Sequence, residues 1–315
     1  MSESTGSVDD AAGEDVPLVK KRRARRQAEL RSKARRLRIN FSIVGVQKAA
    51  TSTLYGMLVE HPEVAGGQEK ELRFFMREKL NWTTPKYAHY ARATDDPQVS
   101  LAGDATPAYF FWPRALERMR AYNPDMRLIV SLRDPIERAF SQWSMERAWN
   151  EEFPDLYDAI DRFAAPTIPE AVPEDRPASA LRKESLFTRG LYGQQLRRGL
   201  LHFPREQWLV LDFRDVFARH EETLDRVTDF LGVERFAEHP PVLHRNQTPN
   251  DHVGRGATVE QLAHLVEIYA PDLRELTELS GLDVSSWATS RVANGETSVE
   301  ELTDKLNGKL GLQTP

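Results

Sequence analysis

The chain has 315 residues, 40% of them hydrophobic, and can therefore bury a substantial core. It has no cysteine, which excludes disulfide bonds, thiolate metal ligands and a thiol nucleophile. It contains no apolar run of about 18 residues and no recognisable secretory signal, so we expect no transmembrane segment and a cytoplasmic location.

The net charge of −5 conceals a strongly basic stretch near the N-terminus. Residues 20–38 carry eleven Lys or Arg residues and a single acid, Glu29. No aromatic residue interrupts this stretch and no apolar face is evident, so we interpret residues 1–38 as a solvated arm, disordered or at most helical. The alternative is an arm that binds nucleic acid or an anionic membrane. Because the rest of the chain is acidic, we expect no specific nucleic-acid partner.

The main pattern begins with Phe41–Leu58, FSIVGVQKAATSTLYGML. A short apolar strand leads into a tight loop at Gln47–Ala50, and a helix follows that opens with three hydroxyl residues. The free N–H groups of a helix's first turn and the positive end of its dipole attract anions. The junction therefore predicts a phosphate or sulfate site with Lys48 at its mouth. The alternative is an ordinary turn whose hydroxyls only cap the helix.

Strands and helices then alternate along the chain. We expect strands near Val64 and at Val99–Gly103, Arg127–Leu132 and Gln207–Phe213. We expect helices at Pro113–Tyr122, after a capping Asp134, at Leu186–Leu201, at Glu221–Leu231, and, as a closing pair, at Thr258–Tyr269 and Pro271–Leu279. The Pro-rich segment Glu151–Ala180 predicts an irregular excursion. The alternation predicts an α/β fold, a mostly parallel central sheet flanked by helices.

This domain would span residues 39–290. A polar tail would follow at 291–315, in which Ser298 and Glu301 can start a short last helix.

Several polar residues fall where the expected strands end. Lys48 follows the first strand, Asp104 ends the strand after Val99, and Arg133 directly follows Leu132. Ligand sites in parallel sheets lie at the carboxyl ends of the strands. We therefore expect these residues to gather at one edge of the sheet, together with Glu71 and with Ser141, which lies on the helix after Arg133.

The nucleotide P-loop, GxxxxGK[ST], is the first motif to test, and the chain lacks it. Lys48 stands three residues after Gly45, no second glycine precedes it, and an alanine follows it. The strand that would carry an acidic magnesium ligand ends instead in Leu132 and Arg133. Arginine suits an anion better than a magnesium ion, so we expect no metal at this site.

A set of motifs in a fixed order gives a more specific signal. The motifs are GVQKAATSTL, HPEV, KELRFF, DATPAYF, RLIVSLRDPIERAFSQW, RGLYGQQLRRGLLHFPREQWLVLDF and LGV. In this order they resemble the sulfotransferases that use 3′-phosphoadenosine-5′-phosphosulfate (PAPS), most closely the heparan sulfate N- and 3-O-sulfotransferases and their bacterial relatives. The resemblance covers roughly residues 39–290 and implies the P-loop-like sulfotransferase fold.

The resemblance assigns roles to residues of this chain. It implies that Lys48 stabilises the leaving phosphate, that Glu71 is the general base for the acceptor, and that Arg133 and Ser141 bind the 3′-phosphate. It implies that the phosphosulfate is held by Gln47, Lys48, Ala49, Ala50, Thr51, Ser52 and Thr53. Arg255, in the polar loop HRNQTPNDHVGRG, would be a further phosphate or adenine contact, unless this is a plain surface loop.

The chain departs from the family pattern at two places. Asp104-Ala105 replaces the Glu-Lys of the heparan sulfate enzymes, and that lysine is associated with the acceptor, so the departure argues against a heparan-like acceptor. Ala49 and Ala50 replace a pair that includes glycine, which fits if their φ angles are negative. We expect the segments Glu151–Ala180 and Trp82–Tyr90 to border the acceptor pocket.

We interpret the chain as a soluble, bacterial-type cytosolic enzyme. It would transfer a sulfuryl group from PAPS to a hydroxyl, or to an amine, of a small molecule, lipid or glycan, without a metal. Two alternatives stay open at this point. One is a P-loop-type kinase or NTPase, and the other is a non-enzymatic adaptor that acts through its basic arm.

Overall fold

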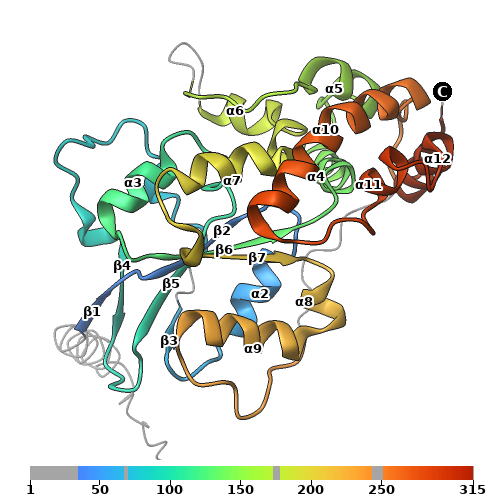
Figure 1. The fold of residues 1–315 in the computed structure, drawn as a ribbon. Coiled ribbons are helices and arrows are strands. Elements are labelled where there is room, and N and C mark those ends of the chain that lie inside the picture. The colour runs from blue at the N-terminus through green and yellow to red at the C-terminus, as the bar shows by residue number, and fades with distance from the viewer. Residues whose placement is uncertain (1–34, 67–69, 173–177, 243–250, 315) are drawn as a thin grey trace, which may run out of the picture.

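The computed structural model describes residues 35–66, 70–172, 178–242 and 251–314. At its centre lies a sheet of five strands in the order β3-β5-β2-β6-β7 (Figure 1), and every neighbouring pair is parallel. The strands are β2 (Phe41–Gly45), β3 (Val64–Ala65), β5 (Leu101–Ala105), β6 (Arg127–Leu132) and β7 (Trp208–Asp212). The parallel α/β fold expected from the sequence is confirmed.

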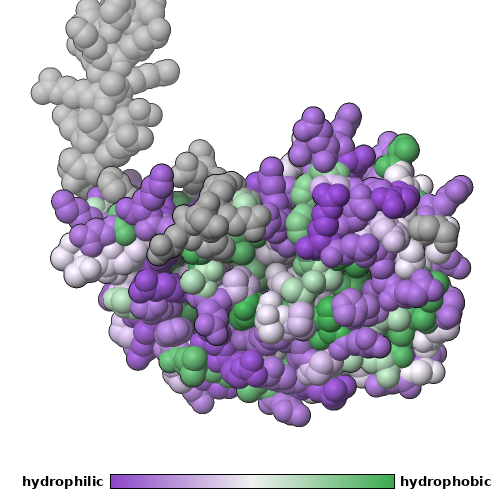
Figure 2. Space-filling view, turned by 90° about the horizontal axis from the view of Figure 1, so that it is seen from above, coloured by the Kyte–Doolittle hydropathy of each residue, from purple (hydrophilic) through white to green (hydrophobic). Residues whose placement is uncertain are grey.

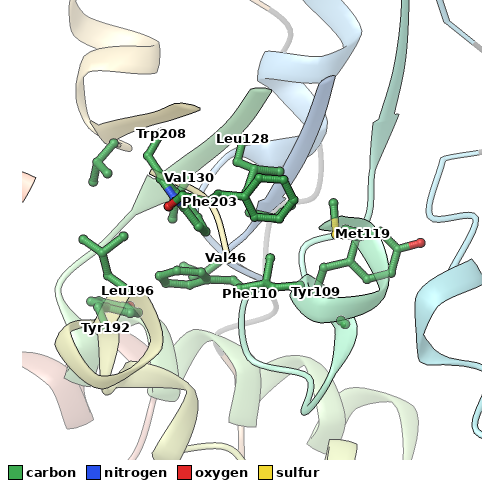
Figure 3. Packing of buried hydrophobic residues seen from close by; sticks show 14 of the residues in the cluster. Val46, Tyr109, Phe110, Met119, Leu128, Val130, Tyr192, Leu196, Phe203 and Trp208 are labelled. Carbon is green, nitrogen blue, oxygen red and sulfur yellow. The ribbon is translucent and has the colours of Figure 1, made fainter. Parts of the chain in front are cut away.

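Helices cover both faces of this sheet, so the central strand β2 is buried along its whole length. On one face, α2 (Thr51–Leu58) and α9 (His220–Leu231) pack through leucines such as Leu54 and Leu224. On the other face, α3 (Ala115–Tyr122), α7 (Tyr192–Leu200) and α10 (Val259–Ser280) contribute to the largest apolar cluster. Figure 3 shows Leu196, Phe110 and Trp208 within that cluster.

The remaining helices are α4 (Pro135–Trp149), α5 (Leu156–Phe163), α6 (Ala178–Glu184), α8 (Asp215–Ala218), α11 (Ala288–Ala293) and α12 (Val299–Leu310). Most of them lie on the side of the sheet that carries α7 and α10 and form the C-terminal part of the molecule, whereas α8 lies beside α9 on the other side (Figure 1). Short 3₁₀ turns occur at Phe74–Met76, Tyr87–His89, Thr188–Gly190 and Arg205–Gln207. The face seen from above in Figure 2 is mostly hydrophilic, with smaller hydrophobic areas between the polar side chains. Along the described residues, no helix combines the length and the apolar character that a membrane span requires.

Two of the expected helix ends are confirmed in detail. The Asp134 side chain accepts a hydrogen bond of 3.0 Å from the backbone N–H of Glu137, and Pro135 is the first residue of α4. The helix α9 ends at Gly232, whose φ of 68° is the left-handed conformation that glycine adopts without steric cost. The cap at Asp134 and the proline after it therefore define the start of α4, the helix that carries Ser141.

The expectation of a disordered or helical arm is wrong for its last four residues. Arg35–Arg38 form strand β1, which pairs antiparallel with β4 (Ala91–Thr94). The guanidinium of Arg35 donates to backbone carbonyls near the end of the loop after β4, and that of Arg36 donates to the carbonyl of Ala88. These long-range contacts cannot be inferred from the charge pattern. Residues 1–34 of the arm lie outside the described residues.

Two further expectations about helices are wrong. The closing pair is one helix, α10, which runs through Pro271. It continues because both halves are packed, the first through Leu265 and the second through Leu276, and this packing outweighs the lost N–H of the proline. The segment Glu151–Ala180 is not irregular throughout, because α5 forms inside it behind the capping Asp155.

The C-terminal segment also differs from the expected polar tail. Its last helix, α12, begins after Ser298, whose side chain accepts a hydrogen bond from the N–H of Glu301, as expected. Leu302, Leu306 and Leu310 on this helix are buried in the apolar cluster that includes α4 and α10. A stripe of three leucines among polar residues is enough to dock the helix, although the composition of the segment is polar.

Candidate active site

The candidate site is a cavity of about 590 Å³ at the carboxyl ends of the central strands. It is lined by Gln47, Lys48, Ala50, Thr51, Ser52, Thr53, Lys70, Glu71, Arg73, Pro107, Arg133, Ser141, Met145, Ala148, Trp149, Arg182, Phe213 and Phe217. Five of these residues are Lys or Arg and one is an acid. The lining formed by the described residues is therefore suited to a ligand that carries several negative charges.

The loop between β2 and α2 forms the floor of the cavity. Helix α2 begins at Thr51, and its N-cap is Ala50, which has no side chain that could accept a hydrogen bond from the first turn. The first N–H groups of a helix have no carbonyl partner within the helix, so this end offers donors and the positive end of the dipole to a bound anion. This geometry favours the anion-site interpretation of the sequence over a self-capped turn.

The backbone of this loop adopts an unusual conformation. Lys48 has a φ of 73° and Ala50 a φ of 57°, both in the left-handed region that residues with a Cβ seldom adopt. The condition of negative φ angles is therefore not met at Ala50, where the resemblance places a glycine in the family pattern. Backbone strain of this kind persists where the surrounding structure holds the loop, and it is often found at binding sites.

The ammonium group of Lys48 lies among other cations. Its pKa is lowered by burial first, and then by the charges of Arg133 and Arg138. The side chain of Arg133 also reaches the backbone of this loop, with 3.5 Å between its Nη1 and the carbonyl oxygen of Lys48. A bound anion would stabilise both cations, because it reduces their mutual repulsion.

Arg133 and Ser141 line the same cavity, as the sequence predicts. The guanidinium of Arg133 forms an ion pair of 3.1 Å with Glu137 and lies 4.9 Å from the ring centre of Phe213. Arg133 is thus a salt-bridge partner as well as a lining residue of the cavity. The ion pair fixes the arginine at the edge of the cavity, where its remaining N–H groups can face a ligand.

Glu71 lies in a loop, outside any helix or strand, and hydrogen bonds to the end of β5 hold this loop in place. Its backbone N–H donates to the carbonyl of Ala105 at 3.0 Å, and the next two N–H groups donate to Asp104 Oδ1 at 3.5 Å and Thr106 Oγ1 at 3.4 Å. Its carboxylate pairs with Arg73 at 2.6 Å. These contacts place the carboxylate on the cavity wall with a defined direction.

Asp104 is the buried support of this loop. It is fully buried and also accepts hydrogen bonds from the hydroxyls of Thr106 at 3.0 Å and Tyr90 at 3.2 Å. Burial raises the pKa of its carboxyl group, and these hydrogen bonds oppose that rise. Asp104 and Thr106 of the DATP motif thus hold the Glu71 segment in place through hydrogen bonds. The position of the motif at a strand end did not predict this role.

Some of the sequence-predicted residues are not brought to the cavity. Ala49, within the loop, is fully buried and is absent from the lining set. Arg255 is half exposed and pairs with Asp155 at 2.9 Å and with Asp158 at 2.8 Å, and it is absent from the lining set. The structure therefore provides Arg255 with partners other than a nucleotide.

The two segments expected to border the acceptor also lie elsewhere. Among the described residues of 82–90 and 151–180, none lines the cavity. Trp82 and Tyr90 pack against Phe74 and Phe75 in the core, where Tyr90 is almost completely buried. Their aromatic character reflects core packing, which sequence alone cannot distinguish from a binding surface.

Sequence reasoning missed several lining residues. Lys70 and Arg73 flank Glu71 in KELRFF, and their positions beside the expected base were an available signal. The ammonium group of Lys70 donates to Ser52 Oγ at 2.5 Å, which joins this segment to the α2 loop. Arg182 and the aromatic residues Phe213 and Phe217 come from distant parts of the chain and carried no local signal.

Comparisons with known proteins show to which family the chain is similar. The model of the sulfotransferase domain matches residues 40–244, which is more than half of the chain. The human heparan sulfate glucosamine 3-O-sulfotransferase 3B1 is 32% identical over 198 residues, which are 61% of this chain and 46% of that protein. The human bifunctional heparan sulfate N-deacetylase/N-sulfotransferase 3 is 26% identical over 201 residues, 61% of this chain and 22% of that protein. The chain thus matches less than half the length of these two curated relatives.

A solved structure shows the same similarity in three dimensions. The crystal structure of a sulfotransferase from Alicyclobacillus acidocaldarius superimposes with a TM-score of 0.58 at 25% sequence identity. The superposition covers 79% of this chain and 98% of that one. The ordered motifs, the parallel sheet and the domain match lead to one conclusion: the chain belongs to the sulfotransferase-domain family.

Proposed function

We propose that the protein transfers a sulfuryl group from PAPS to a hydroxyl group, or to an amine, of a glycan-type acceptor. One observation carries the proposal. Lys48, Glu71, Arg133 and Ser141 come from four separate segments and line one cavity. The ordered motifs predict the same four residues from the sequence alone.

The cavity suits a nucleotide in size and charge. Its volume of about 590 Å³ falls within the range of about 300–1,000 Å³ that is typical of small-molecule sites. The 5′-phosphosulfate would bind at the first turn of α2, and the 3′-phosphate would bind near Arg133 and Ser141. Phe213 and Phe217 supply apolar surface on the same wall, against which a purine ring could pack.

The proposed chemistry is an in-line displacement at sulfur. The acceptor oxygen or nitrogen attacks the sulfur, the bond between sulfur and the 5′-phosphate oxygen breaks, and 3′,5′-ADP leaves. Glu71 takes the acceptor proton, and Lys48 stabilises the negative charge that develops on the leaving phosphate. The carboxylate of Glu71 lies on the cavity wall, where it forms an ion pair of 2.6 Å with Arg73.

The acceptor class rests on the relatives. The two curated relatives named above act on heparan sulfate, as their names state, and this supports a glycan-type acceptor for the present chain. Ala105 stands where those enzymes have a lysine, and the cations of this cavity next to Glu71 in the chain are Lys70 and Arg73.

A transfer assay tests the proposal. The purified protein is incubated with PAPS labelled in its sulfuryl group and with a panel of glycan acceptors that carry free hydroxyl groups, free amines or neither. We expect label in an acceptor and equimolar formation of 3′,5′-ADP. A chain that releases no 3′,5′-ADP with any acceptor and does not bind this nucleotide would contradict the proposal.

A further inference from the structure

Two arginines behind the cavity carry charges that the described residues leave without a salt bridge. Arg138 on α4 is 0% exposed and Arg189 is 3% exposed. Within the described part of the chain, Arg138 Nε and Arg189 Nη2 also have no hydrogen-bond partner. Burying a charge without an opposite charge is strongly unfavourable, so these two arginines need an explanation.

Arg118 shows how the same chain treats a buried arginine elsewhere. It is 4% exposed and pairs with Glu78 at 2.5 Å. It also donates to the carbonyl of Phe75 at 2.7 Å. Arg118 thus has a carboxylate partner, although its Nε also lacks a hydrogen-bond partner, whereas Arg138 and Arg189 have no carboxylate partner among the described contacts.

Both arginines are connected to the α2 loop. Arg189 Nη1 donates to Gln47 Oε1 at 2.8 Å, and Gln47 lines the cavity. Arg138 lies close enough to Lys48 to contribute to the lowering of the pKa of that lysine. The two buried charges therefore lie directly behind the residues that would hold the phosphosulfate.

The neighbouring acids do not neutralise them. Burial, followed by the charges of Arg138 and Arg182, lowers the pKa of Arg189 to about 9. Glu146 and Glu71 act in the opposite direction but form no salt bridge with Arg189 among the described contacts. The region behind the loop thus retains an excess of positive charge in the free protein.

We propose that Arg138 and Arg189 determine the affinity for the donor nucleotide without touching it, because the negative charge of the nucleotide is the counter-ion that the fold does not supply. The inference rests on the proposed function. In a poorly solvated region, charges act over longer distances than in water. The free protein is destabilised by the two cations, and the bound nucleotide gains affinity from them.

Substitution by methionine, which is similar in length and uncharged, tests the proposal. The variants are Arg138→Met and Arg189→Met, and the probe is 3′,5′-ADP in a calorimetric titration. We expect the Kd to rise about tenfold or more in each variant, because at an effective dielectric constant near 20 the attraction between opposite charges still extends beyond direct contact. We expect the Tm of the ligand-free protein to stay constant or to rise, because an unpaired buried charge is removed.

The matched control is Arg118→Met, which removes a buried arginine that has its own carboxylate. We expect the opposite result, a lower Tm of the free protein with an unchanged Kd for 3′,5′-ADP. If the Kd for 3′,5′-ADP stays unchanged in both Arg138→Met and Arg189→Met, the proposal is wrong.

A second pair of variants separates charge from positioning, because Arg189 also holds Gln47. Arg189→Lys keeps the charge, and Arg189→Gln keeps hydrogen-bonding capacity without the charge. We expect the lysine variant to bind 3′,5′-ADP more tightly than the glutamine variant. We also expect the loss of affinity in the glutamine variant to be greater for 3′,5′-ADP than for 5′-AMP, which carries one phosphate fewer.

Equal losses for the two nucleotides would contradict the charge account and would show that Arg189 only positions the loop. The failure of the proposed function looks different. In that case the parent protein itself would not bind 3′,5′-ADP, whereas a failure of this inference leaves parent binding intact.

Discussion

The two walls of the cavity are built in different ways. The wall to which we assign the nucleotide in the proposed function, Gln47–Thr53 with Arg133, directly follows the central strands β2 and β6 and is called the nucleotide wall below. The wall to which we assign the acceptor, Lys70–Arg73, is called the acceptor wall below. Leu72 and Arg73 on this wall donate hydrogen bonds to Asp104 and Thr106, which lie 32 and 33 residues further along the chain. The first wall is thus set by neighbouring strands in the core, and the second depends on a few contacts between loops. Substitutions should therefore separate nucleotide binding from turnover.

The largest expected effect is at Glu71 on the acceptor wall. Glu71→Gln removes the proposed base and should lower kcat by about 10²–10⁴, with an unchanged Kd for 3′,5′-ADP. Turnover with labelled PAPS and calorimetry measure the two quantities. Glu117→Gln is the control, because it removes a carboxylate that also pairs with an arginine, at 3.0 Å from Arg114, outside the cavity. Near-normal turnover of Glu71→Gln would exclude the glutamate as the base.

Lys48 on the nucleotide wall should affect both quantities. Lys48→Met removes the cation beside the leaving phosphate and should lower kcat/KM by about 10²–10³ and weaken the binding of 3′,5′-ADP. Lys79→Met, at an exposed lysine, serves as the control. If Lys48→Met loses turnover but keeps its affinity for 3′,5′-ADP, Lys48 does not bind the nucleotide. That result would contradict its assignment to the nucleotide wall.

The lowered pKa of Lys48 also predicts that the affinity for 3′,5′-ADP depends on pH. Because the folded pKa lies below 10.5, the lysine loses its proton at a lower pH than an exposed lysine does. The affinity for 3′,5′-ADP should therefore fall as the pH rises through that folded pKa. The pH profile of the Kd for Lys48→Met should lack this step. Identical profiles for the two proteins would show that Lys48 does not face the nucleotide.

Asp104 supports the acceptor wall from below and should show a smaller effect. Asp104→Asn weakens the acceptors for Leu72, Thr106 and Tyr90, so the Glu71 loop loses its fixed position. We expect kcat to fall about tenfold, because the base is misplaced rather than removed, with the Kd for 3′,5′-ADP unchanged.

The control for this variant is Asp272→Asn. Asp272 is also buried, and it accepts hydrogen bonds from the N–H groups of Gly193 and Gln194 away from the cavity. Both variants should be less stable than the parent, but only Asp104→Asn should lower kcat. Equal kcat values for the two variants would exclude a positioning role for Asp104.

The smallest expected effect is on the stability of the nucleotide wall. Ala50→Gly relieves a left-handed alanine, which costs about 1–2 kcal/mol, and increases the entropy of the unfolded chain, which costs about 0.4–1 kcal/mol. We expect a net gain of about 0.5–1 kcal/mol in the free energy of unfolding. Ala49→Gly, one residue earlier and outside the positive-φ set, should destabilise instead. Chemical denaturation measures both, and a loss of stability in Ala50→Gly would show that the loop is not strained there.

The sequence predicts the nucleotide wall better than the acceptor wall for a physical reason. A strand, a loop and a helix that follow one another leave a local pattern, and this pattern located Lys48, Arg133 and the cap of α4 correctly. The capping of α12 by Ser298 was visible for the same reason. The parallel sheet followed from the alternation of these local units.

Features that depend on contacts between distant segments could not be predicted. The pairing of β1 with β4, the role of Asp104 beneath Glu71 and the position of Arg182 on the cavity wall are of this kind. The aromatic stretch at Trp82–Tyr90 was misinterpreted because core packing and ligand binding require the same residue types. The helix through Pro271 was missed because tertiary packing overrides the local penalty of a proline.

The central claim is that this cavity binds the PAPS nucleotide, and one calorimetric titration tests it most directly. The parent protein is titrated with 3′,5′-ADP in the presence of a metal chelator, and in parallel with ATP and magnesium. The account predicts saturable binding of one 3′,5′-ADP per chain, independent of the metal, and much weaker binding of ATP. Binding of ATP with magnesium in preference to 3′,5′-ADP would contradict the account.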